Sequence, residues 1–179
     1  QKLRLDFFIL ESERDEGKYI DIDMEEAEFK PYDNKTLPWN DDIDKHMFTL
    51  RSIFYLDKSL QGSSLALFVD PQNYPHNIYL NGEIIYRAGR YKENYNSVIR
   101  RASAVYLSEA DLIYSDDKPN EIAVELFPKY ENTPLSLMYI SSYDNVVTDV
   151  FWTNFFYTDI IRGSFFISLI IFIYFAFLI

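Results

Sequence analysis

The stretch Asn77-Ile-Tyr-Leu-Asn81-Gly82-Glu-Ile-Ile-Tyr86 places two apolar runs on either side of an Asn-Gly pair. Both central residues of a type I′ turn need a positive φ angle, which Asn and Gly tolerate best. Two apolar runs separated by such a pair are typical of a β-hairpin. The sequence therefore predicts two antiparallel strands over residues 77–86, joined by a tight turn at Asn81 and Gly82.

Short apolar runs on both sides of this hairpin also have the lengths of strands. Residues 65–69, LALFV, form a nearly continuous apolar run that predicts a strand buried on both faces. The other predicted strands lie at residues 3–10, 19–24, 46–56, 98–107, 121–127 and 134–140, with turns at residues 57–64 and 116–120. Residues 146–157 alternate loosely, and no helix longer than two turns is expected before Thr158. This pattern disfavours parallel βαβ units and predicts an all-β fold, an antiparallel jelly-roll sandwich.

The last residues, 163–179, read GSFFISLIIFIYFAFLI and carry no charge. A helix that is apolar on every side is either the centre of a large protein or a membrane span, and this chain offers no large apolar surface to cover it. At about 1.5 Å per residue the stretch reaches roughly 25 Å, slightly less than the ~30 Å hydrocarbon core of a bilayer. We expect a transmembrane α-helix over residues 158–179, the truncated first span of a longer membrane protein.

The residues just before this span are those expected at a membrane surface. An aromatic belt lies at the boundary between lipid and water, and the side chains that fit it are Trp152, Phe155, Phe156 and Tyr157. Asp159 and Arg162 are predicted to form an interfacial ion pair. The lipid bilayer is therefore an expected partner.

Charge and composition exclude several classes of function. Asp and Glu outnumber Lys and Arg by 28 to 17, for a net charge of −11, so nucleic acid is not an expected partner because it needs a basic footprint. The absence of cysteine removes disulfides, thiolate nucleophiles and Cys-based zinc sites. Neither His46 nor His76 has the spacing of a zinc hydrolase, and no Gly-x-Ser-x-Gly elbow occurs. We expect no enzyme, cofactor or metal, although the acidic loop of Asp41, Asp42 and Asp44 leaves a cation site open.

Five short motifs follow one another between residues 37 and 127. They are Leu-Pro-Trp at 37–39, Arg-x-x-Phe at 51–54, LALFV at 65–69, Ile-Tyr-Leu-Asn-Gly at 78–82 and Asn-Glu-Ile-Ala-Val at 120–124. This order resembles the galactose-binding-like jelly roll, particularly the sugar-binding domain of family 2 glycoside hydrolases. Followed by a membrane span, it is similar to the extracytoplasmic N-terminal domain of bacterial seven-transmembrane receptors with diverse intracellular signalling modules.

The resemblance implies a sensor in the inner membrane of a bacterium. Its soluble domain would lie on the periplasmic or extracellular side and bind a carbohydrate or another small ligand. Further transmembrane helices and a cytoplasmic output domain would follow in the same longer chain. The predicted organisation has N-terminal strands or an extension at residues 1–30, the ligand-binding β-sandwich at 31–157 and the transmembrane helix at 158–179. Residues 146–162 are expected to couple the last two parts.

Two alternatives remain open from the residues alone. The first is a surface adhesion or protein-interaction module with a single anchor, which would have a basic stop and a short tail after the span. The second is a tethered carbohydrate-active enzyme. Its carboxylate pair can be chosen from so many acidic residues that their presence favours no particular site.

Ligand-binding residues are expected among aromatic side chains in loops. Sugar rings present apolar faces that stack on flat side chains, while their hydroxyl groups need Arg, Asn or Asp partners. The residues that fit are Trp39, Tyr74, His76, Arg90, Tyr91 and Tyr95. Covering the ends of the sandwich is the competing role for each of them. Arg51, within a strand, is predicted to be structural, pairing with an acid or packing its aliphatic stem.

Overall fold

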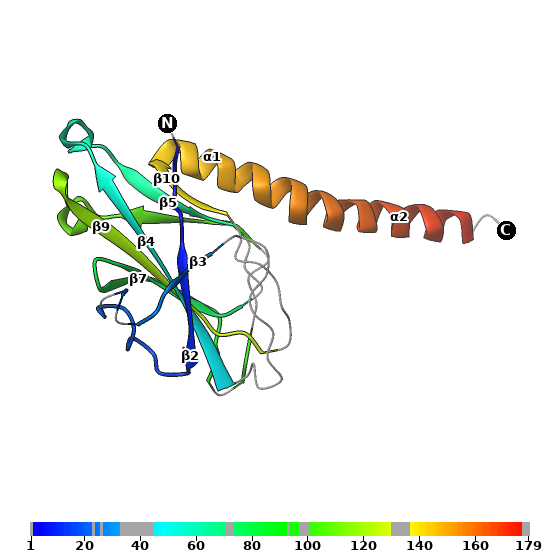
Figure 1. Cartoon of the computed structure of the whole chain (residues 1–179). Helices are drawn as coiled ribbons and strands as arrows, with labels where there is room; N and C mark the ends of the chain where they lie inside the picture. Colours follow the sequence, from blue (N-terminus) through cyan, green and yellow to red (C-terminus); the bar gives the residue numbers. More distant parts are fainter. Residues whose placement is uncertain are drawn as a thin grey trace.

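The computed structural model describes residues 2–22, 24–25, 27–32, 45–70, 74–92, 94–96, 101–129 and 137–176. In these residues ten strands form two antiparallel sheets, and a long helix follows the last strand (Figure 1). The strands are β1 (Leu3–Arg4), β2 (Phe8–Glu13), β3 (Lys30–Pro31), β4 (His46–Leu56), β5 (Leu65–Val69), β6 (His76–Leu80), β7 (Glu83–Ala88), β8 (Ser103–Leu107), β9 (Ser115–Leu126) and β10 (Met138–Ser142). The helical elements are the 3-10 turns η2 (Lys58–Leu60) and η3 (Glu109–Asp111), α1 (Tyr143–Asn154), the π-helical turn η4 (Phe155–Asp159) and α2 (Ile160–Ala176). The predicted antiparallel sandwich followed by an apolar helix is confirmed.

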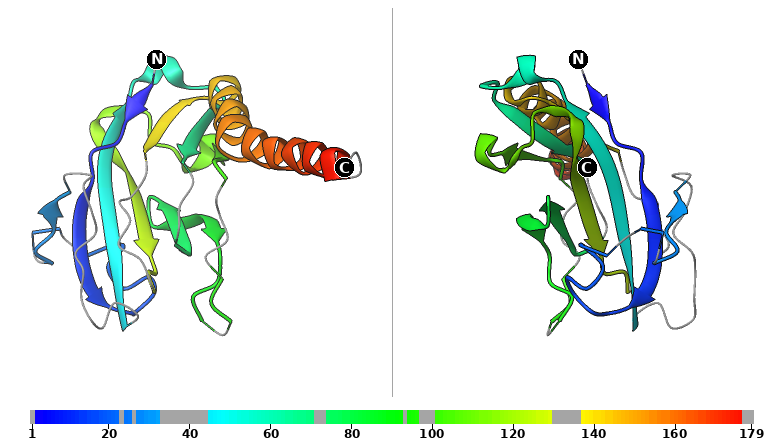
Figure 2. Two further views of the ribbon diagram at one scale, coloured as in Figure 1. Left: turned by 90° about the vertical axis from the view of Figure 1, so that its right-hand side faces the viewer. Right: turned by 60° about the vertical axis from the view of Figure 1, so that its left-hand side comes forward.

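The two sheets pack face to face around one hydrophobic core. A four-stranded sheet of order β1-β10-β5-β8 faces a six-stranded sheet of order β3-β2-β4-β9-β6-β7 (Figure 2). On β5, Leu65 and Leu67 belong to this core, whereas Ala66 and Phe68 belong to a second cluster on the opposite face of the sheet. All five residues of β5 are buried, which confirms the predicted strand with two covered faces.

The predicted hairpin is formed by β6 and β7. Asn81 and Gly82 have φ angles of 50° and 86°, in the left-handed region that this turn requires. The Asn81 side chain donates to the Asp111 carbonyl at 2.7 Å and accepts from the Glu121 amide at 2.8 Å. Long-range hydrogen bonds therefore reinforce a turn that is already favoured locally.

The strand predicted at residues 19–24 is wrong, because the described residues there form turns. Ile20 does bury its side chain, against Tyr79 and Ala123. The backbone, however, is bonded by side chains instead of a neighbouring strand, as the Ile22 carbonyl accepts a hydrogen bond from Arg51. The burial of Ile20 therefore does not require that this segment be a strand.

The turn predicted at residues 116–120 lies inside β9 as an irregular stretch. The register of β9 against β4 moves from Asn120 opposite Phe54 directly to Ser115 opposite Leu56. The amides of the intervening Asp117 and Lys118 donate to the Ser115 hydroxyl at 3.1 and 3.2 Å. The polar residues therefore leave the ladder locally, although the strand continues on both sides.

The helix begins much earlier than the sequence predicts. The helix continues from Tyr143 through η4 into α2, and its residues 143–174 are long and apolar enough to cross a membrane by length and composition. The expectation of no long helix before Thr158 is wrong. Val146, Val150 and Asn154 recur every fourth residue, so that one face of α1 meets the four-stranded sheet.

The sheet side of α1 carries both apolar and charged contacts. Val146 is fully buried in the cluster that includes Phe68 and Tyr139. Asp149 accepts a hydrogen bond from the Tyr139 hydroxyl and lies 2.5 Å from the ammonium group of Lys2. The head and the start of the helix therefore pack together over several turns (Figure 1).

The end of this contact differs from the predicted interfacial pair. Asp159 pairs with Arg101 at 2.8 Å, not with Arg162. The side-chain amide of Asn154 bonds the backbone of Ala102 at the start of β8. Residues 101–102 and η4 therefore join the head to the helix just before the apolar span.

Candidate functional site

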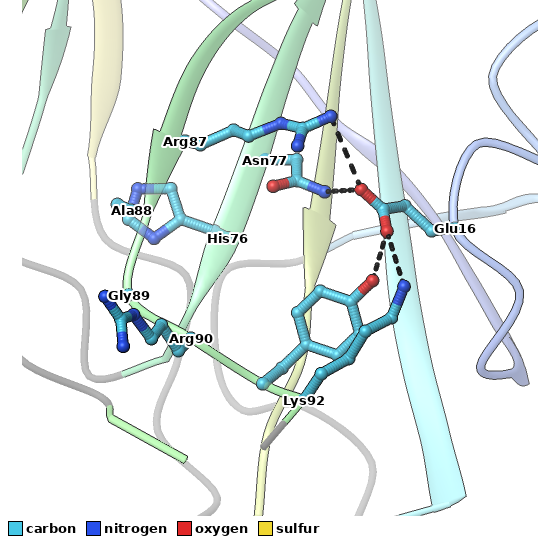
Figure 3. A pocket seen from close by; sticks show the side chains of 9 residues that line it. Glu16, His76, Asn77, Arg87, Ala88, Gly89, Arg90 and Lys92 are labelled. Carbon is cyan, nitrogen blue, oxygen red and sulfur yellow. Dashed lines mark hydrogen bonds and ion pairs between the residues drawn. The ribbon is translucent and has the colours of Figure 1, made fainter. Parts of the chain in front are cut away.

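A pocket of about 440 Å³ lies beside β6, β7 and the loop that follows β7. Its lining residues are Glu16, His76, Asn77, Arg87, Ala88, Gly89, Arg90, Tyr91 and Lys92 (Figure 3). Three of the predicted ligand residues, His76, Arg90 and Tyr91, are therefore brought to one place.

Glu16 is the centre of the polar contacts in this pocket (Figure 3). Its carboxylate accepts hydrogen bonds from the Tyr91 hydroxyl, from Asn77 Nδ2 at 3.2 Å and from Lys92 Nζ at 3.2 Å. A guanidinium nitrogen of Arg87 lies 3.6 Å from the same carboxylate. The Tyr91 hydrogen bond, followed by the contacts with the two cations, holds the pKa of Glu16 below its ordinary value. The carboxylate is therefore ionised at neutral pH.

The segment that carries Glu16, the strap (residues 14–22), crosses the outer face of the six-stranded sheet. The Gly17 amide donates to the Glu125 carboxylate at 2.6 Å. Glu125 also accepts from Asn77 at 3.2 Å and from the Tyr79 hydroxyl at 2.8 Å. Because Glu125 is fully buried, these donors are needed to compensate its lost hydration. They also fix the strap to β6 and β9.

The loop after β7 is closed by its own backbone. The Arg90 amide donates to the Asn96 carbonyl at 3.0 Å, and the Asn96 amide donates back at 2.8 Å. Gly89 has a φ angle of 75°, and a Cβ atom there would lie 2.6 Å from the Asn96 carbonyl oxygen, so that only glycine fits. The Tyr91 ring stacks on Phe127 with 3.7 Å between ring centroids. These contacts set the position of the loop at the pocket.

His76 and Tyr74 are buried side chains. Tyr74 belongs to the core between the sheets. His76 Nδ1 lies 2.9 Å from the Tyr74 carbonyl oxygen, which can only accept, so Nδ1 carries the proton. Burial lowers the pKa of His76, and the ring is therefore neutral at pH 7. Its Nε2 is buried without a hydrogen bond among the described residues.

The remaining predicted residues are distributed around this pocket. Tyr95 donates a hydrogen bond to the Phe127 carbonyl at 3.2 Å, in the same loop but outside the pocket lining. Trp39 and the acidic residues Asp41, Asp42 and Asp44 lie outside the described residues. Arg51 is structural, as predicted, because its Nη2 donates to Glu121 at 2.6 Å and its guanidinium lies 5.4 Å from the Phe29 ring centroid.

Sequence reasoning missed Glu16, Asn77, Arg87 and Lys92. Arg87 and Lys92 could have been found, because the stretch RAGRYK at residues 87–92 holds three basic residues in an acidic chain. Glu16 has no such signal, since 61 positions separate it from its partner Asn77. Only the folded strap places this carboxylate at the pocket.

Comparisons with known proteins indicate the fold. No protein-family model matches this sequence, and no curated protein sequence matches it. A glycosyl hydrolase family 2 member from Bacteroides cellulosilyticus gives a TM-score of 0.55 at 14% identity, over 79% of this chain and 20% of that protein. A β-glucuronidase from Bacteroides uniformis gives 0.55 at 15% identity, over 79% and 18%. A β-glycosidase from Bacteroides vulgatus gives 0.53 at 10% identity, over 79% and 20%.

At these identities the likeness shows the fold alone. The chain spans about a fifth of the length of these enzymes. The predicted resemblance to family 2 glycoside hydrolases is therefore confirmed at the level of the β-sandwich. The seven-transmembrane receptor context stays a prediction.

Proposed function

We propose that this chain is the ligand-binding, membrane-tethered part of a bacterial signalling receptor. The sandwich lies on the periplasmic or extracellular side and binds a carbohydrate or a related small polar ligand in the pocket beside β6 and β7. The observation that carries the proposal is the continuous helix over residues 143–174, which is packed on the sandwich at one end and apolar at the other. A head held so firmly on a membrane span is suited to relaying a change in shape.

The pocket loop and the helix are connected through a short piece of chain. The loop that carries Arg90 and Tyr91 closes at Asn96, and only residues 97–100 separate it in sequence from Arg101. Arg101 pairs with Asp159, and the next residue, Ala102, is bonded by Asn154. A ligand that moves the loop therefore acts on η4 through residues 101–102. This route supplements the covalent junction between β10 and α1.

We propose binding without catalysis at this site. Glycoside hydrolysis uses two carboxyl groups that flank the scissile bond, whereas Glu16 is the only acidic residue in the described pocket lining. Among the described residues the Glu16 carboxylate contacts two neutral donors, Asn77 and Tyr91, and two cations, Arg87 and Lys92. A carboxylate held in this way is suited to positioning the loop.

The proposal is tested on the full chain in nanodiscs. The chain has no cysteine, so a pair of introduced cysteines can be labelled selectively, one at Asn94 on the pocket loop and one at the exposed Tyr157 in η4. We expect a sugar ligand to perturb the NMR signals of residues 87–92 and to change the distance distribution between a label on the loop and a label near η4. Ligand binding without any change in that distribution would contradict the relay and support the single-anchor adhesion alternative.

The side of the membrane is tested separately in intact bacterial cells that make the chain with an export signal. A cysteine at Ser63 should react with a membrane-impermeant maleimide before the cytoplasmic membrane is opened, after permeabilisation of any outer membrane. Reaction only after lysis of the cytoplasmic membrane would place the head in the cytoplasm and overturn the proposed localisation.

A further inference from the structure

We infer that the ligand of this pocket carries a carboxylate beside its hydroxyl groups, so that hexuronates bind in preference to neutral hexoses. This inference rests on the proposed function and names the chemical class of ligand for the same site.

Positive charge is concentrated at the pocket although the protein is acidic. Arg87, Arg90 and Lys92 line it together with the single carboxylate of Glu16, an excess of two positive charges in a chain of net charge −11. Counting Glu125, which lies behind Asn77, an excess of one remains. A partly enclosed site with this sign attracts an anion, and a singly charged one matches the small excess best.

Arg90 is the cation that the protein leaves for a ligand. Arg87 and Lys92 already lie 3.6 and 3.2 Å from the Glu16 carboxylate. The guanidinium of Arg90 makes no hydrogen bond or ion pair with the described residues, while its backbone is fixed by two hydrogen bonds with Asn96. A guanidinium presents two parallel N–H donors that match the two oxygens of a carboxylate. The backbone of Arg90 is therefore fixed at the pocket, while its guanidinium can bind the carboxylate of a ligand.

Asn77 provides the complementary group for a hydroxyl. Its Nδ2 donates to Glu16 and Glu125, both at 3.2 Å. Its Oδ1 has no hydrogen bond among the described residues and points away from Glu16 (Figure 3). An amide oxygen only accepts, and a sugar hydroxyl can donate to it. A ligand that has both a carboxylate and hydroxyl groups can therefore use Arg90 and Asn77 together, whereas a neutral hexose leaves Arg90 unpaired.

The experiment compares matched acidic and neutral sugars on the full chain in nanodiscs of neutral lipid. D-Galacturonate and D-glucuronate are titrated beside D-galactose and D-glucose, with isothermal titration calorimetry and NMR shifts of residues 87–92 as readouts. We expect at least one hexuronate to bind tenfold or more tightly than its neutral counterpart, and its affinity to fall as salt rises. Arg90→Gln should weaken hexuronate binding about tenfold. Arg4→Gln, at an exposed arginine of β1 in the other sheet, should leave it unchanged.

The outcomes separate this inference from the proposed function. Equal affinity for hexuronates and neutral hexoses overturns the inference and leaves a sugar-binding head. The same holds if Arg90→Gln binds hexuronates as tightly as the unaltered chain. Absence of binding by all four sugars overturns both the inference and the proposed carbohydrate ligand.

Discussion

The side-chain amide of Asn154 bonds both backbone groups of Ala102, accepting from its N–H at 2.8 Å and donating to its carbonyl at 3.1 Å. Asn154 is the last residue of α1, and Ala102 is buried immediately before β8. An asparagine side chain therefore pairs with the sheet as a neighbouring strand would. This contact holds the end of α1 against the sheet, just before the helix continues away from the head.

Asn154→Ala should detach the end of α1 from the sheet. It leaves the buried N–H of Ala102 without its partner, which costs about 1–3 kcal/mol. Hydrogen exchange should accelerate at residues 101–105, measured by mass spectrometry on the chain in nanodiscs. Asn145→Ala is the matched control, because Asn145 is exposed on the same helix. Equal exchange in the two variants would argue against a fastening role for Asn154.

Val146→Ala should weaken the docking of α1 more than Val147→Ala does. Val146 is fully buried against the sheet, whereas its neighbour Val147 is 40% exposed. Loss of two buried methyl groups costs on the order of 1–2 kcal/mol, and the exposed site should lose a few tenths at most. Chemical denaturation of the two variants in the same detergent gives the comparison. A similar midpoint for both would mean that the helix face has been misassigned.

Gly89→Ala should damage the pocket loop, and Gly62→Ala serves as its control. Both glycines have positive φ angles, 75° and 79°, but only at Gly89 would the new Cβ meet backbone atoms, the Asn96 oxygen at 2.6 Å and the Pro75 Cα at 3.0 Å. The φ angle alone costs roughly 1–2 kcal/mol in each variant. The extra loss at Gly89, seen in thermal unfolding and in the NMR signals of residues 87–92, measures the close approach. If both variants lose the same stability, the backbone of the loop moves aside freely.

Glu16→Gln should remove part of the acid sensitivity of the head. The folded pKa of Glu16 lies below its ordinary value of 4.5. The unfolded chain therefore binds the proton more readily, and the stabilisation is complete above that value and is lost as the pH falls through the folded pKa. At pH 7 the variant should be less stable by about 1 kcal/mol. Denaturant titrations at several pH values should show this difference shrinking towards zero in acid; a difference independent of pH would assign it to packing.

The parts of the fold predicted correctly are those determined by neighbouring residues. The Asn81-Gly82 turn and the doubly covered strand β5 each lie within a single short stretch of sequence. The strand predicted at 19–24 is wrong, although the sequence there alternates between polar and apolar residues. Ile20 is buried against the sheet, and the Ile22 carbonyl is bonded by the Arg51 side chain and not by a neighbouring strand. Tertiary contacts therefore decided the structure of that segment.

Missing α1 had a different physical cause. Residues 146–157 are rich in Val, Thr, Phe and Trp, which favour strands locally, and only the recurrence of Val146, Val150 and Asn154 indicates a docked helix. Three of the predicted ligand residues, His76, Arg90 and Tyr91, line one pocket, and their role in binding stays a prediction. The central carboxylate of this pocket, Glu16, could not be found from sequence because the strap brings it across the sheet from 61 residues away.

The π-helical turn η4 sets the rotation of the apolar helix α2 relative to the head and its pocket. A π turn accommodates one residue more than an α turn, and one residue corresponds to about 100° of rotation about the helix axis. Val146 and Asn154 hold α1 on the sheet, so α1 cannot rotate about its own axis. The extra residue of the π turn therefore determines the direction in which the side chains of α2 point around the helix axis. Removal of a single residue between 155 and 159 would rotate the head relative to α2 by about 100° around the helix axis, so that a different side of α2 would lie below the pocket.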